Sequence, residues 1–148
     1  MGRIFAIDYG KQRIGIAVTD SEKIIASGLT TLASPEIFKF IEDYLKKEIV
    51  ERFVVGYPKT LRNEKSEATV FIDPFLEKLQ KKYPHIPISL VDERFTSKIA
   101  FQTMIDGGVK KMARRNKALI DKISATIILQ SYLACIIHKN KQNDVNIL

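Results

Sequence analysis

The stretch IFAIDYGKQRIGIAVTD, residues 4–20, contains two apolar runs separated by a short polar break. Both runs are short and rich in β-branched residues, which is typical of strands, and the glycine in the break is typical of a tight turn. The stretch therefore predicts strands over 3–8 and 13–19. Asp8 stands where the first run ends. Taken alone, this carboxylate is either an ordinary turn residue or one arm of a metal site.

Further strands and helices are predicted along the rest of the chain from the spacing of apolar residues. The first of these helices should begin at Ser34 as its N-cap, with Pro35 in its first turn. The predicted elements are a strand over 23–32, this helix, a strand over 52–58, a helix around 69–80, a strand over 86–97, a helix over 97–105 and a last helix over 116–138. Their order predicts an α/β domain with a mixed sheet, parallel where helices connect the strands.

Length and composition are those of a single globular domain with a sizeable core. The chain has 148 residues, of which 45% are hydrophobic and 28% charged. We expect the domain to occupy 1–138 and the polar segment 139–148 to be a flexible tail. The net charge of +7 favours a polyanionic partner such as nucleic acid. The single cysteine, Cys135, excludes an intrachain disulfide.

The most apolar segment, 118–137, includes Asp121, Lys122, Gln130 and Ser131. Such a composition favours a buried core helix over a membrane span. The amino-terminal apolar run is too short for a secretion signal. We therefore expect a cytoplasmic protein with no membrane partner. The sequence alone does not predict an oligomeric state.

Acids occupy positions where an ordinary core would not place them. On a helix, Asp121 shares a face with apolar residues three, four and seven positions away, so it should be hydrogen-bonded, ion-paired or bound to a metal. A role in stabilising the first helical turn would explain it equally well. Asp92 and Glu93 end a predicted strand, and because successive side chains alternate in direction, only one of them can face a given site.

Together these acids predict a metal site, because ligands gather at the carboxyl ends of strands in α/β sheets. Carboxylates without a histidine or cysteine cluster suit Mg²⁺ or Mn²⁺, and two such ions can cleave a phosphodiester. Each acid also has basic residues close by in the sequence, as a phosphate-binding surface would need. The candidate nucleic-acid-binding residues are Lys11, Arg13, Arg94, Lys110, Lys111, Arg114, Arg115 and Lys117.

Four motifs, in this order and spacing, resemble the YqgF/RuvX family: IDYGKQRIGIAVTD, VVGYP, VDERFTS and ALIDKISATIIL. The resemblance spans about residues 3–137. It implies an RNase H-like fold, which is a five-stranded mixed sheet with helices on both sides. It also implies a catalytic, metal-binding triad of Asp8, Glu93 and Asp121, with Glu93 preferred to Asp92. Members of the family are named as Holliday junction resolvases and as nucleases of pre-16S ribosomal RNA.

This resemblance implies a metal-dependent endonuclease holding two Mg²⁺ or Mn²⁺ ions. We expect it to process the 5′ end of pre-16S rRNA in ribosome biogenesis, with a ribosomal particle as a possible partner. Resolution of branched DNA is the alternative, although no dimer interface is evident in the sequence. The loop 59–66 departs from the family pattern, and Ser124-Ala125 replace its usual paired alanines.

Two further readings compete with the nuclease. A P-loop is excluded because Ile16 and Ala17 replace the Lys and Ser/Thr that bind phosphate and metal. A non-catalytic RNA-binding factor in ribosome assembly needs the same basic surface but no metal, and fold alone does not decide between these two. No stripe of aromatic residues suited to stacking on bases is evident in the sequence.

Overall fold

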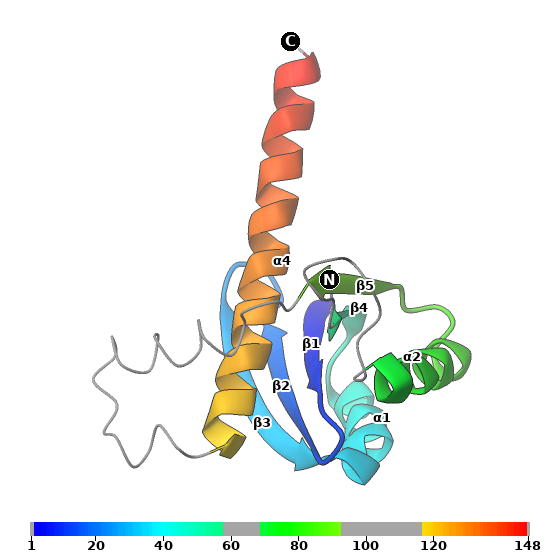
Figure 1. Ribbon diagram of the computed structural model, residues 1–148. Helices are drawn as coiled ribbons and strands as arrows, with labels where there is room; N and C mark the ends of the chain where they lie inside the picture. Colours follow the sequence, from blue (N-terminus) through cyan, green and yellow to red (C-terminus); the bar gives the residue numbers. More distant parts are fainter. Residues whose placement is uncertain (1, 58–68, 93–116, 148) are drawn as a thin grey trace.

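A computed structural model describes residues 2–57, 69–92 and 117–147, with the side chains of the last segment described through residue 136. Figure 1 shows one twisted sheet with helices against both of its faces. The strands are β1 (Arg3–Tyr9), β2 (Arg13–Thr19), β3 (Ala26–Ala33), β4 (Val50–Tyr57) and β5 (Ile88–Asp92). The helices are the 3-10 turn η1 (Ser34–Glu36), α1 (Ile37–Lys47), α2 (Thr69–Lys82) and α4 (Lys117–Ile147).

The sheet is mixed, and its spatial order is β3-β2-β1-β4-β5. The first three strands form an antiparallel meander, in which Asp8 of β1 lies opposite Gly15 of β2. The strands β4 and β5 are parallel to β1, because helical segments connect them. The predicted mixed α/β sheet is thus confirmed.

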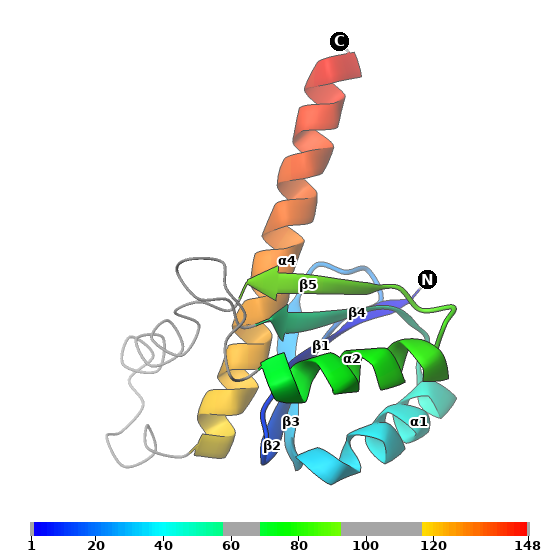
Figure 2. The ribbon, with the colours of Figure 1, turned by 45° about the vertical axis from the view of Figure 1, so that its right-hand side comes forward.

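Strand alternation gives the sheet two apolar faces. Phe5 and Ile7 point toward α1 and α2, where they pack in a large core cluster with Ile37, Ile41, Phe75 and Leu79 of the helices. Ile4 and Ala6 point the other way, and they pack under α4 with Ala17, Val54, Ala125, Ile128 and Leu129. Figure 2 shows the resulting layers, with α1 and α2 on one side of the strands and α4 crossing the other. Near-complete burial on both faces explains the continuous apolar runs in β1 and β4.

The start of α1 differs from the prediction. Ser34 is not an N-cap: η1 precedes α1, and neither cap position makes a side-chain hydrogen bond. Instead, the Ser34 hydroxyl donates a 2.7 Å hydrogen bond to the carbonyl of Gly10 in the β1–β2 turn. The serine is therefore used for a tertiary contact, and Pro35 supplies the fixed backbone angle that starts the turn.

The last helix is longer than predicted. Its backbone continues to Ile147, through the segment assigned to a polar tail, and it extends well beyond the sheet in Figure 1. Over Lys117–Ile136 it is long and apolar enough to cross a membrane by length and composition, a property it shares with core helices of soluble proteins. Its residues Ser124, Ala125, Ile128 and Leu129 are buried against the sheet. The helix predicted over 97–105 lies outside the described residues.

Candidate active site

The carboxyl ends of β1, β4 and β5 meet at one edge of the sheet, because these three strands run in parallel. Figure 2 shows the arrowheads of β4 and β5 ending beside α4. Asp8 is the penultimate residue of β1, and Asp92 is the last residue of β5. Asp121 lies in the first turns of α4. This edge therefore collects the described acids that the sequence singled out.

Asp8 lies on the face of the sheet that α4 covers. It alternates in register with Ile4 and Ala6, which pack under α4, and its side chain is partly exposed. Its neighbour across the β1–β2 ladder is Gly15. The end of the strand thus carries a carboxylate at the boundary between the α4-side core and solvent.

Gly15 is a point where the backbone of α4 approaches the sheet closely. A Cβ added to Gly15 would collide with the backbone carbonyl of Asp121. The backbone of α4 therefore rests directly on β2 at this position, which only a residue without a side chain permits. Since Gly15 also faces Asp8 in the ladder, the two aspartates are both neighbours of this glycine. The fold brings together Asp8 and Asp121, which are far apart in the sequence.

The carboxylate of Asp121 is held by Arg13. The Nε atom of Arg13 donates a 2.8 Å hydrogen bond to Oδ2 of Asp121, and both side chains remain partly exposed, at 38% and 22%. A hydrogen bond of 2.6 Å from Thr31 to the carbonyl of Ala118 fixes the same helical turn. Arg13, predicted to bind phosphate, is thus paired with an acid of the predicted triad.

Asp92 takes the opposite direction from Asp8. Val91 packs in the α4-side cluster, so alternation along β5 directs Asp92 away from that face. Asp92 is exposed at the end of the strand. This direction disfavours Asp92 as a partner of Asp8 and Asp121.

The other predicted site residues divide into those that the structure describes and those that lie outside the described ranges. Lys11 is exposed in the turn between β1 and β2, and Lys117 is exposed as the first residue of α4. Within the described ranges, no group of three or more metal-ligating side chains occurs. The predicted residues outside the described part of the chain are Glu93, Arg94, Lys110, Lys111, Arg114 and Arg115.

A second feature at this end of the sheet was missed by the sequence analysis. On the face opposite Asp8, aromatic side chains surround a pocket of about 430 Å³. Tyr9 stacks on Phe75 with ring centroids 4.4 Å apart, and Phe38 lies 5.6 Å from Phe75. Phe71, at 41% exposure, also lines the pocket. No periodic signal could reveal this set, because its members come from β1, α1 and α2.

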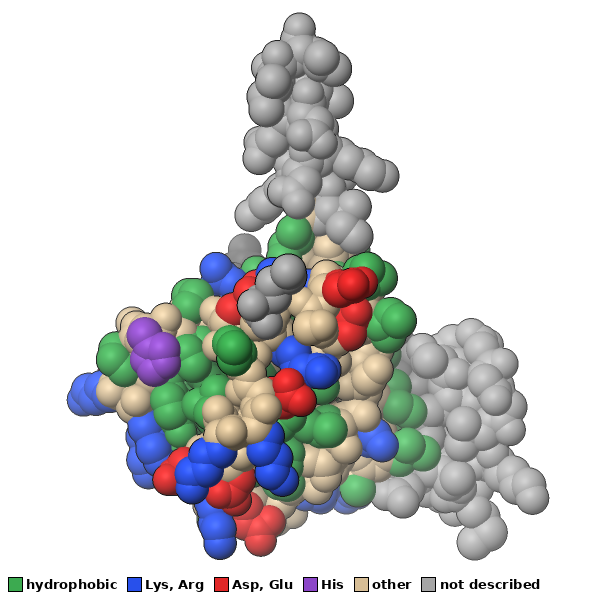
Figure 3. Space-filling model, turned by 180° about the vertical axis from the view of Figure 1, so that it is seen from behind, with side chains coloured by type: hydrophobic (Ala, Val, Ile, Leu, Met, Phe, Trp, Pro, Cys, Tyr) green, Lys and Arg blue, Asp and Glu red, His purple; other side chains and the backbone are tan. Residues whose placement is uncertain are grey.

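At the amino ends of the strands, opposite the edge with Asp8, basic side chains are paired with acidic ones. Figure 3, viewed from behind, shows basic and acidic side chains intermixed over the described part of that side. At the amino end of β1, Arg3 pairs with Glu48 at 3.2 Å. Lys23 pairs with Glu51 at 2.7 Å, and this hydrogen bond lowers the pKa of Glu51. Paired surface charges of this kind are a poor basis for a polyanion-binding surface.

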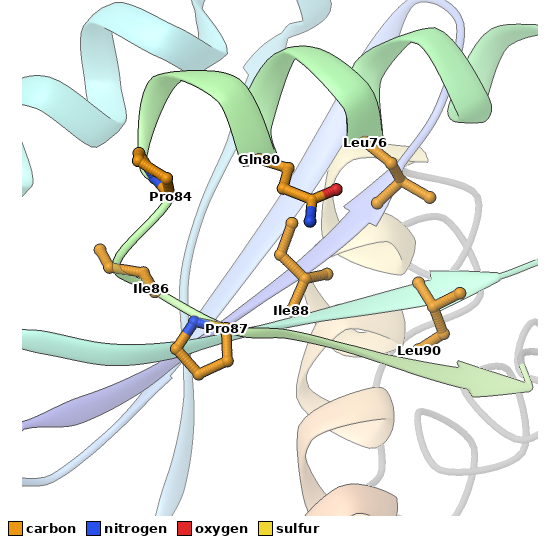
Figure 4. Close-up of a pocket in the computed structure, with 7 residues that line it drawn as sticks. All are labelled: Leu76, Gln80, Pro84, Ile86, Pro87, Ile88 and Leu90. Carbon is orange, nitrogen blue, oxygen red and sulfur yellow. The ribbon is translucent and has the colours of Figure 1, made fainter.

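Among the described residues that line it, the pocket between α2 and β5 has no acid or base. Figure 4 shows it lined mainly by apolar side chains, with Gln80 as the polar one. Outside this pocket, at the carboxyl end of β4, the Tyr57 hydroxyl donates a 2.9 Å hydrogen bond to Asp73, and this bond to a carboxylate raises the pKa of Tyr57. The chemistry-bearing edge is therefore the one with Asp8, Arg13 and Asp121.

Comparisons with known proteins identify relatives of the whole chain and a solved structure of similar fold. The chain is 59% identical over 133 residues to a Christiangramia forsetii protein and to a Phocaeicola vulgatus protein, both named "Putative pre-16S rRNA nuclease". These alignments cover 90% of this chain and 98% and 96% of the two relatives. Among solved structures, T. thermophilus RuvC in complex with a Holliday junction substrate matches with a TM-score of 0.57 at 16% identity, covering 92% of this chain and 96% of RuvC.

The RuvC match shows the fold, which is the RNase H-like α/β fold with a five-stranded mixed sheet. The model of the family described as "RuvX: Holliday junction resolvase" matches residues 2–135. That match spans both the edge with Asp8 and the start of α4, and the chain belongs to the RuvX family.

Proposed function

We propose that this chain is a metal-dependent endonuclease that processes the 5′ end of pre-16S rRNA. The observation that carries the proposal is that Asp8 lies opposite Gly15 at the carboxyl edge of the sheet and the backbone of Asp121 packs on the same glycine. The names of the bacterial relatives support the nuclease activity and its substrate. They also favour a cytoplasmic location and a ribosomal particle as the setting of the reaction.

The donor set fits a hard divalent cation. Asp8 and Asp121 offer carboxylate oxygens, the ligands preferred by Mg²⁺ and Mn²⁺, and we propose Glu93 as the third ligand. Ions held there would activate water and stabilise the departing oxygen of a phosphodiester. Arg13 orients the Asp121 carboxylate through its 2.8 Å hydrogen bond. We propose that Lys11, Arg94, Lys117 and the 110–115 basic residues hold the phosphate backbone.

Branched DNA is the second candidate substrate. The specific observations that favour it are the family description and the junction bound to the structurally similar RuvC. We favour pre-16S rRNA as the substrate because the relatives of high identity are named as pre-16S rRNA nucleases. A non-catalytic RNA-binding role is the third outcome that an experiment must be able to reveal.

A cleavage panel tests these alternatives together. The purified protein is incubated with a pre-16S rRNA 5′ fragment, a four-way DNA junction and single strands, in Mg²⁺, in Mn²⁺ and in EDTA. We expect cleavage of the rRNA fragment in either metal and none in EDTA. Asp8→Asn and Asp121→Asn should each lower the rate by about 100-fold or more, because each removes a ligand charge.

Asp43→Asn is the matched control, since Asp43 is an exposed acid on α1 with only a loose 4.0 Å contact to Lys46. It should leave the rate unchanged. Cleavage of the junction alone would transfer the proposal to branched DNA. Retained RNA binding without cleavage in any metal would support the assembly factor instead.

A further inference from the structure

The aromatic pocket beside the β1–β2 turn combines stacking surfaces with lysines that form no ion pair with a described residue. We define the aromatic–lysine groove by its lining residues Tyr9, Lys11, Phe38, Phe71, Phe75 and Lys78. The Lys11 ammonium lies 4.9 Å from the centroid of the Phe71 ring. The Lys78 ammonium lies 4.8 Å from the centroid of Phe38, and that of Lys82 lies 5.2 Å from it. The rings of Phe71 and Phe38 therefore each have a cation beside them.

The charge of the groove is of one sign. Among the described residues, its lining includes Lys11 and Lys78 and no acid. This differs from the amino end of the strands, where lysine and arginine are paired with glutamates. An apolar surface bordered by lysines attracts an anionic partner with flat rings more strongly than a cationic or a purely apolar partner. Its complement is a ligand that alternates phosphates with aromatic faces.

The groove is held in place by the turn that follows Asp8. The Ser34 hydroxyl donates to the Gly10 carbonyl at 2.7 Å, and the Ser34 amide donates to the Gln12 carbonyl at 3.0 Å. These bonds tie the residues on either side of Lys11 to η1, which lines the same groove. A Cβ at Gly10 would stand 2.5 Å from the Arg13 carbonyl, so glycine is needed for this tight turn.

The groove and the proposed active site share one strand end. Asp8 and Tyr9 are consecutive, and alternation directs Asp8 to the α4 face and Tyr9 to the face with α1 and α2. A nucleic-acid strand that extends from the edge with Asp8 would therefore reach the groove at the next residue of β1. Single-stranded nucleic acid fits this path, because only unpaired bases present their faces to aromatic side chains.

We propose that the aromatic–lysine groove binds a single-stranded segment of the nucleic-acid substrate that flanks the bond to be cleaved. Bases stack on Phe71 and Phe38, while Lys11 and Lys78 contact the phosphates. The inference rests on the proposed nuclease function, because that function places the bond to be cleaved at the edge with Asp8. Binding of the strand to the groove can nevertheless be measured without cleavage. RNA and DNA single strands share the recognised chemistry, and the experiment separates them.

The test is equilibrium binding in the Asp8→Asn background with EDTA, which prevents cleavage. Fluorescently labelled single strands of about twelve nucleotides, as RNA and as DNA of the same sequence, are compared with an RNA duplex by anisotropy. We expect single strands to bind more tightly than the duplex. Phe71→Leu should weaken single-strand binding by about tenfold, because leucine keeps the apolar surface but has no ring face. Phe71→Tyr should restore it.

Matched controls separate the groove from general surface effects. Val70→Ala alters the exposed neighbour of Phe71 on α2, and Lys47→Gln removes an exposed charge on α1. Both should leave single-strand binding unchanged. Lys11→Gln should weaken binding and lower the slope of log affinity against log salt by about one. Tighter binding of RNA or of DNA identifies which nucleic acid the groove prefers. Either preference supports the proposal that the groove binds a single strand.

Duplex binding as tight as single-strand binding, or no effect of Phe71→Leu, would overturn the inference. The two proposals fail separately. If Asp8→Asn abolishes cleavage while Phe71→Leu leaves binding intact, the nuclease stands and the groove does not. If Phe71→Leu weakens binding but no metal supports cleavage, the groove stands and the nuclease does not.

Discussion

Gly15 shows how one residue without a side chain can organise the proposed catalytic edge. It lies opposite Asp8 in the β1–β2 ladder and beneath the backbone of Asp121. Any Cβ there must push α4 away from the sheet, because the atom it meets is backbone rather than a side chain that can rotate. The glycine therefore controls the separation of two proposed metal ligands.

We expect Gly15→Ala to destabilise the protein by about 2 kcal/mol or more and to abolish metal-dependent cleavage. Gly28→Ala is the matched change, since its Cβ would meet side-chain atoms of α4, Cγ of Lys122 at 2.8 Å and Oγ1 of Thr126 at 3.0 Å, rather than its backbone. Its cost should be smaller than that of Gly15→Ala. Urea denaturation with cleavage assays measures both. Equal effects of the two variants would contradict the role assigned to Gly15.

The Arg13–Asp121 ion pair is a positioning contact rather than a source of stability. Because both side chains are partly exposed, Arg13→Gln should change the free energy of unfolding by less than about 1 kcal/mol. It should nevertheless lower the cleavage rate by about tenfold or more, since Asp121 loses its orientation. Arg13→Lys should recover part of that rate. A variant with wild-type cleavage at every Mn²⁺ concentration would show that the pair plays no part in the site.

At the scale of elements, the β2–β3 hairpin depends on a carboxylate in its turn. Asp20 accepts hydrogen bonds from the amides of Ile25 at 3.0 Å and Ile24 at 2.8 Å, and these bonds lower its pKa below the ordinary 3.8. Lys23 in the same turn adopts a positive φ of 61°. The turn thus relies on an ionised acceptor to hold a backbone that lysine seldom adopts.

A pH dependence of stability follows from the direction of this shift. A carboxyl whose pKa is lower in the folded state contributes stability above its unfolded pKa, and that stability is lost as the pH falls through the folded value. Asp20→Asn keeps an acceptor oxygen but cannot titrate. Its melting temperature should therefore fall less steeply than that of the wild type between about pH 5 and pH 2. Parallel curves would contradict this assignment.

At the scale of the whole molecule, the sheet separates two surfaces that meet at one edge. The α4 face carries Asp8 and Asp121, and the face covered by α1 and α2 carries the aromatic–lysine groove. A substrate that reaches both must pass around the carboxyl end of β1. The fold therefore places proposed chemistry and proposed strand binding on opposite sides of the same strand end.

Metal binding should stabilise the folded protein, because the ligands converge only after α4 docks on the sheet. We expect Mn²⁺ to raise the melting temperature of the wild type and to leave that of Asp8→Asn unchanged. Asp43→Asn should respond as the wild type does. A metal-dependent shift of equal size in Asp8→Asn would place the ion elsewhere on the protein.

Local patterns were sufficient for the order of the elements and for the acids at their ends. Alternation and the lengths of apolar runs predicted β1, β2 and β4 closely, because burial on a sheet imposes a period of two on neighbouring residues. Asp8 was singled out because it stands where the first apolar run ends, and Asp121 because it shares a helix face with apolar residues; their role as metal ligands stays a prediction. The choice of Glu93 came from family resemblance and stays a prediction.

Tertiary structure alone decided which residues meet. The Arg13–Asp121 contact joins residues 108 positions apart, and the bond from Ser34 to Gly10 replaced a predicted helix cap. The aromatic–lysine groove draws its rings from three elements, so no window of sequence contains it. Such contacts depend on the crossing of α4 over β2 and the packing of α2 beside β1. These long-range arrangements leave no periodic trace in the residues that make them.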